Sequence, residues 1–121
     1  MDDTETGFET LLVWQKAHRF VLDVYHLTKS FPDTERFSLT SQLQRAAISI
    51  PANIAEGYAK RSSADKARFY NISQGSISEC RYFLILAHDL NYSDTTTLMS
   101  ELDQVGRMLN SYTQKILSAR S

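Results

Sequence analysis

Three histidines and one cysteine are the side chains best suited to chemistry in this sequence. His18 and His26 lie eight residues apart, not at the one-turn spacing of a helical metal pair, and His88 is distant from both. Asp23 and His26 are three residues apart, but a di-iron bundle needs two such pairs and two further carboxylates. Cys80 falls among apolar residues at helical spacing, which is typical of a buried, inert thiol. We therefore expect no metal, no cofactor and no enzymatic activity, and a metal- or ligand-dependent enzyme is the weakest alternative.

A group of basic residues offers a different chemistry, the binding of phosphate. Tyr58, Phe69 and Tyr70 are interleaved with it. Because cations neutralise phosphates and aromatic rings stack on bases, this pattern favours a contact with RNA or DNA. The alternative is a solubilising turn whose aromatic side chains face inward. The group, named the basic cluster below, consists of Lys60, Arg61, Lys66 and Arg68.

Charge is distributed unevenly along the 121 residues, although the net charge is only −1. The first nine residues hold four acids and no base, and we expect residues 1–10 to be an acidic, disordered tail. From Arg36 to His88 there are seven bases and three acids, which gives a mildly basic body. One cysteine excludes an internal disulfide framework. The sequence has no secretory signal and no apolar run near the ~20 residues that span a bilayer, so we expect a cytoplasmic protein without a membrane partner.

Four segments carry apolar residues at intervals of three and four, the spacing of one helix face. No segment shows the sustained alternation of a strand. Together they predict an all-α fold, an up-down-up-down antiparallel four-helix bundle over residues 11–118. The expected helices cover residues 11–30, 36–57, 63–90 and 94–118.

Each predicted helix has an apolar stripe that we expect to form the core. The stripes consist of Val13, Ala17, Phe20, Val24, Leu27 and Phe31 in the first helix; Leu39, Leu43, Ala46, Ala47, Ile50 and Ile54 in the second; Phe69, Ile72, Ser76, Cys80, Phe83, Ala87 and Leu90 in the third; and Leu98, Leu102, Val105, Leu109, Tyr112 and Ile116 in the fourth.

The ends of the helices also have sequence signals. Gly57 is a stop signal for the second helix. Ser62 and Asp65 have the spacing of a capping box at the start of the third. Ser93 is expected to cap the fourth helix.

Pro51 lies inside the second predicted helix and removes one backbone hydrogen bond, at a cost of ~3 kcal/mol in a regular helix. We therefore expect a kink at this residue. Small residues surround it and allow another helix to approach closely, and the third helix has a similar patch. We expect the two patches to face each other. They consist of Ala46, Ala47, Ser49 and Ala52 in the second helix and Ser73, Gly75 and Ser76 in the third.

Several apolar residues fall outside the four stripes. A lone bundle needs about three apolar positions per heptad, so the surplus favours a subunit interface. The alternative is a wide core edge, because scattered apolar residues on a surface are normal. These residues are Trp14, Val21, Leu22, Ile48, Ile77, Ile85, Met99 and Met108.

The stretch from "LLVWQKAHRF" through "QLQRAAISIPANIAEGYAKRS" to "RFYNISQGSISECRYF" resembles a bacterial four-helix-bundle family. That family was first noticed as the protein encoded in intervening sequences of the 23S ribosomal RNA gene. Its motifs are VWQKA at residues 13–17, FP at 31–32, QLQRAA-S-IP-NIAEG at 42–57 and GS--E at 75–79. The resemblance covers roughly residues 11 to 116.

This resemblance implies an up-and-down bundle that assembles as a homopentameric barrel without known catalysis. Relatives include the accessory variability protein of diversity-generating retroelements, a basic pentamer that works with a reverse transcriptase and its RNA. A nucleic-acid partner is therefore implied as well. The family motif falls on a set of polar residues in this chain, which are Arg45, Asn53, Glu56, Arg61, Ser62 and Glu79.

Two hypotheses about function follow. In the first, the chain is a non-enzymatic homo-oligomer, a pentamer by resemblance, whose basic cluster contacts RNA or DNA. In the second, it is a protein-binding scaffold or adaptor, and the basic cluster only solubilises it.

Overall fold

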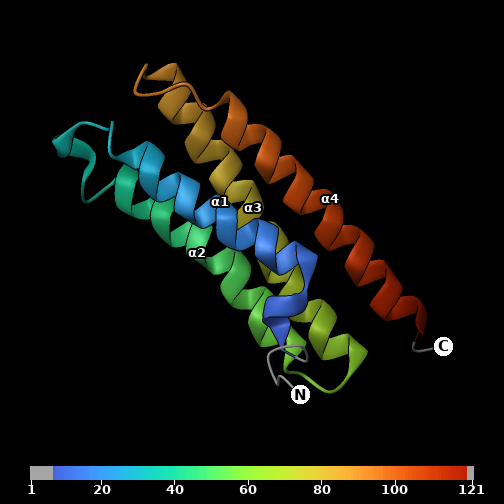
Figure 1. Ribbon diagram of the computed structural model, residues 1–121. Helices are drawn as coiled ribbons and strands as arrows, with labels where there is room; N and C mark the ends of the chain where they lie inside the picture. Colours follow the sequence, from blue (N-terminus) through green and yellow to red (C-terminus); the bar gives the residue numbers. More distant parts are fainter. Residues whose placement is uncertain (1–6, 120–121) are drawn as a thin grey trace.

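The structure, a computed structural model, describes residues 7–119, and four long α-helices form most of this part of the chain. Each helix packs against the next one, and α1 also packs against α4, which closes the bundle (Figure 1). The predicted up-down-up-down bundle is confirmed. Its helices are α1 (Leu12–Thr28), α2 (Leu39–Tyr58), α3 (Ser63–Asp89) and α4 (Thr96–Ala119).

The core is formed by the stripes that the periodicity of α1, α2 and α4 predicts. All six stripe residues of α2 are buried, as are the first four of α4. In α1 only Leu27 is partly exposed. The residues of these stripes recur every three or four positions, so one face of each helix is largely removed from water.

The buried face of α3 matches the predicted one only in part, because Ser76, Cys80 and Ala87 are buried as predicted and other members are not. Ile72 and Leu90 are exposed, whereas Tyr70, Ile77 and Leu84 are buried. Apolar residues occur all around this helix, so periodicity alone does not select a face. Contact with both α2 and α4 selects it.

The folded region begins earlier than residue 11. Phe8–Thr10 form a short 3-10 helix, η2, and the Phe8 ring packs edge-on against Trp14 with centroids 5.1 Å apart. The side-chain amide of Gln15 donates to the carbonyl of Glu9 at 2.8 Å. The acidic tail was predicted to reach residue 10, but residues 8–10 are folded against α1. Residues 1–6 lie outside the described residues.

The α1–α2 connection contains a second 3-10 helix, η3 (Asp33–Glu35), so α2 starts later than expected. The Glu35 carboxylate accepts hydrogen bonds from the hydroxyls of Ser38 at 2.6 Å and Tyr92 at 2.7 Å. These bonds, that of Ser38 first, lower the pKa of Glu35. Because Tyr92 belongs to the α3–α4 connection, this carboxylate joins the two connections at one end of the bundle.

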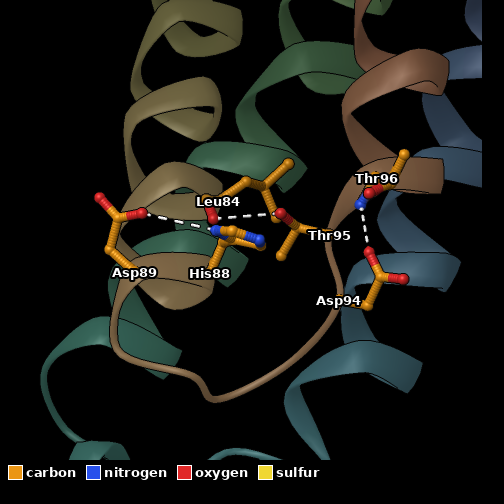
Figure 2. A network of polar contacts seen from close by, with 6 residues as sticks. All are labelled: Leu84, His88, Asp89, Asp94, Thr95 and Thr96. Atoms are coloured by element: carbon orange, nitrogen blue, oxygen red, sulfur yellow. Dashed lines mark hydrogen bonds and ion pairs between the residues drawn. The ribbon is translucent and has the colours of Figure 1, made fainter.

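The α3–α4 connection begins at Asn91, whose φ of 62° is left-handed. The N–H of Tyr92 then reaches the Ala87 carbonyl at 2.9 Å, as in a Schellman motif. Ser93 was predicted to cap α4, but Asp94 supplies the side-chain hydrogen bond at the start of this helix. The carboxylate of Asp94 accepts from the N–H of Thr96 at 3.0 Å, and the buried Thr95 hydroxyl donates to the Leu84 carbonyl at 3.3 Å (Figure 2).

Gly57 does not end α2. The helix continues to Tyr58, and no described glycine has a positive φ. A Cβ at Gly57 would lie 2.6 Å from Cε1 of Tyr70 and 3.1 Å from Cβ of Phe69. Glycine is therefore required here by the close approach of α3.

Pro51 is buried within the helical span of α2. It has no N–H to bond the carbonyl one turn earlier. The kink at Pro51 stays a prediction.

Candidate functional site

The small-residue patches of α2 and α3 meet through hydrogen bonds as well as packing. The Ser73 hydroxyl donates to the Ile50 carbonyl at 2.9 Å, and the Ser76 hydroxyl donates to the Ser49 hydroxyl at 2.8 Å. Both serines on α3 are buried. Gly75, the third member of the α3 patch, is exposed and has open space beside it. The predicted contact is therefore present through the two serines and not through the glycine.

The polar residues of the family motif are divided between internal and external positions. The Asn53 amide donates to both the carbonyl and the hydroxyl of Ser49 at 2.9 Å, beside the α2–α3 contact. Ser62 caps α3 by accepting from the N–H of Asp65 at 3.1 Å, as its spacing predicts. Arg45 and Glu79 are exposed, and within residues 7–119 neither has a hydrogen-bond or ion-pair partner.

Lys66, a member of the basic cluster, closes the C-terminal end of α2. Its ammonium donates to the Tyr58 carbonyl at 2.7 Å and lies 5.3 Å from the centre of that residue's ring. The last carbonyls of a helix have no intrahelical donor, and a cation there also complements the helix dipole. Lys66 therefore acts as a C-terminal cap of α2.

Two of the other three basic side chains, Lys60 and Arg68, lie against the ring of Phe69. Lys60 lies 5.1 Å and Arg68 lies 4.7 Å from the centre of its ring. Lys60 also pairs with Glu56 of the family motif at 3.2 Å, and Arg68 lies 3.9 Å from Asp65. Arg61 is exposed and has no such partner among the described residues.

The aromatic residues of this region are not all available for stacking. Tyr70 is fully buried, so it cannot meet a base from outside. Tyr58 and Phe69 are partly exposed. The inward-facing alternative holds for Tyr70 and does not hold for the other two.

The side chains suited to catalysis are dispersed. Within residues 7–119, no three His, Cys, Asp or Glu side chains gather as metal ligands would. Burial, followed by the charge of Glu79, raises the pKa of Cys80 to about 12, which keeps the thiol protonated at neutral pH.

A carboxyl pair between α1 and α4 was not found from the sequence. Asp23 and Glu101 line a cavity of about 240 Å³ together with Lys16 and Arg19. Burial, and then a hydrogen bond and like charge from Asp23, raise the pKa of Glu101 to about 7. Arg19 pairs with Asp23 at 3.4 Å. The available signal was that both acids directly precede a core residue, Val24 in one case and Leu102 in the other.

The surplus apolar residues divide into three groups, one of which, Trp14, Met99 and Met108, is partly buried against the core. Val21 and Ile77 belong to the core, whereas Leu22, Ile48 and Ile85 are 52%, 43% and 43% exposed. Tyr82 of α3 is also exposed. An apolar groove of about 290 Å³ runs between α1 and α2 and leads to Ile48. It is lined by Phe8, Trp14, His18, Val21, Ile48, Pro51, Ala52 and Ala55.

No helix within residues 7–119 combines the length and the apolar character needed to cross a bilayer.

The fold and these sites define a class of protein, a closed four-helix bundle with a basic end and exposed apolar surfaces. The chain belongs to the family of the 23S rRNA-intervening sequence protein, whose model matches residues 9–111. No curated protein matches it in sequence. The crystal structure of a protein of unknown function from the S23 ribosomal protein family of Bacteroides thetaiotaomicron is similar, with a TM-score of 0.78 and 24% identity over 85% of this chain and 96% of that one.

Proposed function

We propose that this protein is a non-enzymatic bundle that works as a homo-oligomer and contacts RNA or DNA through its basic cluster. The observation that carries the assembly is the pair of exposed apolar surfaces, the α1–α2 groove and the outer side of α3 with Ile72, Tyr82 and Ile85. A contact between unlike surfaces of successive copies gives a ring when the rotation between copies closes, and an open filament when it does not. The family resemblance favours five copies.

Nucleic-acid contact is supported by the charge at the α2–α3 end. The four bases of the cluster exceed the neighbouring Glu56 and Asp65 by two, and Arg61 is exposed. One such end is weakly basic, but a ring brings several together on one strand, and multivalent contact raises affinity without new chemistry.

A protein-binding scaffold is the second candidate function. It is favoured by the fact that Lys60, Lys66 and Arg68 already contact groups of the chain itself.

Assembly is tested by light scattering. We expect a mass near five times the 13.8 kDa of one chain, and a loss of assembly in Ile48→Glu and in Tyr82→Glu. Phe37→Glu is the control, because Phe37 is 87% exposed in the α1–α2 connection, away from both surfaces. A monomeric mass at every concentration would exclude the oligomer.

Nucleic-acid binding is tested by titrating structured RNA and single-stranded DNA at low and high salt. We expect affinity to fall steeply with salt and to be lost when Lys60 and Arg61 are both changed to Glu. The double variant Lys29→Glu, Arg36→Glu makes the same charge change at the other end of the bundle. It should bind nucleic acid more tightly than the double variant of Lys60 and Arg61. Absence of binding at low salt would favour the scaffold.

A further inference from the structure

Three acidic residues precede the part of the chain that the structure describes. They are Asp2, Asp3 and Glu5, and residues 1–6, named the acidic segment below, contain no base. The acidic segment joins the described chain at Gly7. The place of Gly7 in the fold therefore decides which surface the three carboxylates can reach.

The chain that follows Gly7 is fixed beside the C-terminal half of α2. The short helix η2 contacts α2 (Figure 1), and the ring of Phe8 lines the α1–α2 groove together with Ala52 and Ala55. The Thr10 hydroxyl donates to the Gly7 carbonyl at 2.7 Å and holds the start of this turn in place. Gly7 is therefore held near the end of α2 from which the basic cluster follows.

The basic cluster lies within reach of the acidic segment. Lys60 follows Ala55 by five residues, which is about 7.5 Å at 1.5 Å per helical residue. Six extended residues span up to ~20 Å. The acidic segment can therefore reach Lys60 and the exposed Arg61 without any movement of the bundle.

The charges of the acidic segment and the basic cluster are complementary. The four bases of the cluster exceed the neighbouring acids Glu56 and Asp65 by two, and the acidic segment carries three negative charges. Lys16 and Arg19, the first lysine and arginine of α1, instead share a cavity with two carboxyl groups. The basic cluster therefore offers the acidic segment a surplus of positive charge.

We propose that the acidic segment docks on the basic cluster of the same chain and competes there with the phosphates of a nucleic acid. Each exposed ion pair is weak, but the short connection through Gly7 keeps the acids at millimolar effective concentration, so several weak pairs suffice. A strand must displace the segment before it binds, and the segment therefore lowers its affinity. The competition deepens the proposed function and rests on it, whereas the internal contact does not.

Neutral acids test the competition. In the triple variant Asp2→Asn, Asp3→Asn, Glu5→Gln, we expect single-stranded DNA to bind about three- to tenfold more tightly at low salt. The gain should shrink as salt is added, because salt screens exposed charges.

A control variant changes the net charge by the same amount outside the α2–α3 end. It neutralises three exposed acids, which are Asp33, Glu79 and Asp89. We expect a smaller gain in DNA affinity from this variant than from the triple variant. Equal gains would show an effect of net charge alone and would overturn the competition, as would DNA binding that the triple variant leaves unchanged.

A disulfide trap tests the internal contact without nucleic acid. Thr4→Cys with Ala59→Cys places one thiol in the acidic segment and one beside Lys60, and it retains every charge. The buried Cys80 stays inert, because its pKa is raised to about 12. We expect an intramolecular disulfide under mild oxidation, formed severalfold more slowly in high salt or when the three acids of the segment are neutral.

The outcomes of the trap separate the internal contact from its alternatives. A rate that salt and neutral acids leave unchanged would show only that the short connection brings the thiols together, and it would overturn the contact. Disulfide-linked pairs of chains in dilute protein would place the segment on a second copy and would also overturn it. A charge-dependent internal disulfide in a protein that binds no DNA would support the contact and refute the nucleic-acid function.

Discussion

The α2–α3 and α1–α4 contacts hold the same bundle together with opposite chemistry. Between α2 and α3, short neutral side chains such as Ser73 bond across the interface, and Gly57 meets the ring of Tyr70 directly. Between α1 and α4, Asp23 and Glu101 share a cavity of about 240 Å³ with basic side chains. The first contact depends on shape, whereas the second also contains a carboxyl group, Glu101, whose raised pKa makes it sensitive to pH.

This difference has a physical consequence. Hydroxyl and amide hydrogen bonds do not titrate near neutral pH, so pH should leave the α2–α3 contact unchanged. A carboxyl group with a raised pKa links the α1–α4 contact to pH.

Gly57→Ala should have the largest effect, because it breaks the contact that depends on shape. The added Cβ would lie 2.6 Å from a fully buried ring, and overpacking of this kind lowers the free energy of unfolding by about 2–3 kcal/mol. Gly75→Ala is the matched control on α3. It faces open space and should stabilise the protein by about 0.5–1 kcal/mol, since alanine favours a helix. Urea unfolding measures both, and equal effects would refute the assigned role of Gly57.

Glu101→Gln should have an intermediate effect that depends on pH. The pKa of Glu101 is raised from an ordinary 4.5 to about 7, so the folded state binds this proton more tightly than the unfolded chain does. Its stabilising contribution is therefore complete below about pH 4.5 and is lost as the pH rises through 7.

The neutral amide of Glu101→Gln should remove that loss. We expect the variant to exceed the unchanged protein by about 1–2 kcal/mol at about pH 8, after allowance for solvent screening, and to match it under acidic conditions. Glu79→Gln makes the same substitution at an exposed position on α3 and is the control. A pH profile unaffected by Glu101→Gln would show that the α1–α4 carboxyl pair does not titrate as inferred.

Ser73→Ala should have the smallest effect and sharpens the account of the α2–α3 contact. It removes one buried hydrogen bond to the Ile50 carbonyl, worth about 1 kcal/mol, and this loss should not vary with pH. Ser78→Ala, at an exposed position on the same helix, should be neutral. A pH-dependent loss from Ser73→Ala would contradict the distinction between the two contacts.

Most of the fold could be predicted because three helices have a single apolar stripe. The stripes of α1, α2 and α4 select one face without knowledge of their neighbours. In α3, both Ile72 and Ile77 are candidates for the core by sequence. Only the packing of α3 against α2 and α4 decides that Ile77 is buried and Ile72 is exposed. Gly57 was misread for a related reason, because a glycine needed for close approach looks like a stop signal in sequence.

The candidate sites were predictable only where their members are near in sequence. The basic cluster lies within nine residues, so its composition was evident, but the use of Lys66 as a helix cap depends on its distance to the Tyr58 carbonyl. The Asp23–Glu101 pair joins the first helix to the last, and the spacing of residues along the chain contains no record of such a pair.

The sequence by itself determined the helical bundle, the capped start of α3 and the basic character of the α2–α3 end. These follow from helical periodicity, local hydrogen bonding and charge, which all act over a few residues. Only the tertiary structure decided which face of α3 is buried, why residue 57 is glycine, which cations are engaged and where polar cavities open. These outcomes depend on side chains from different helices meeting at contact distance, because excluded volume and hydrogen bonding act through space.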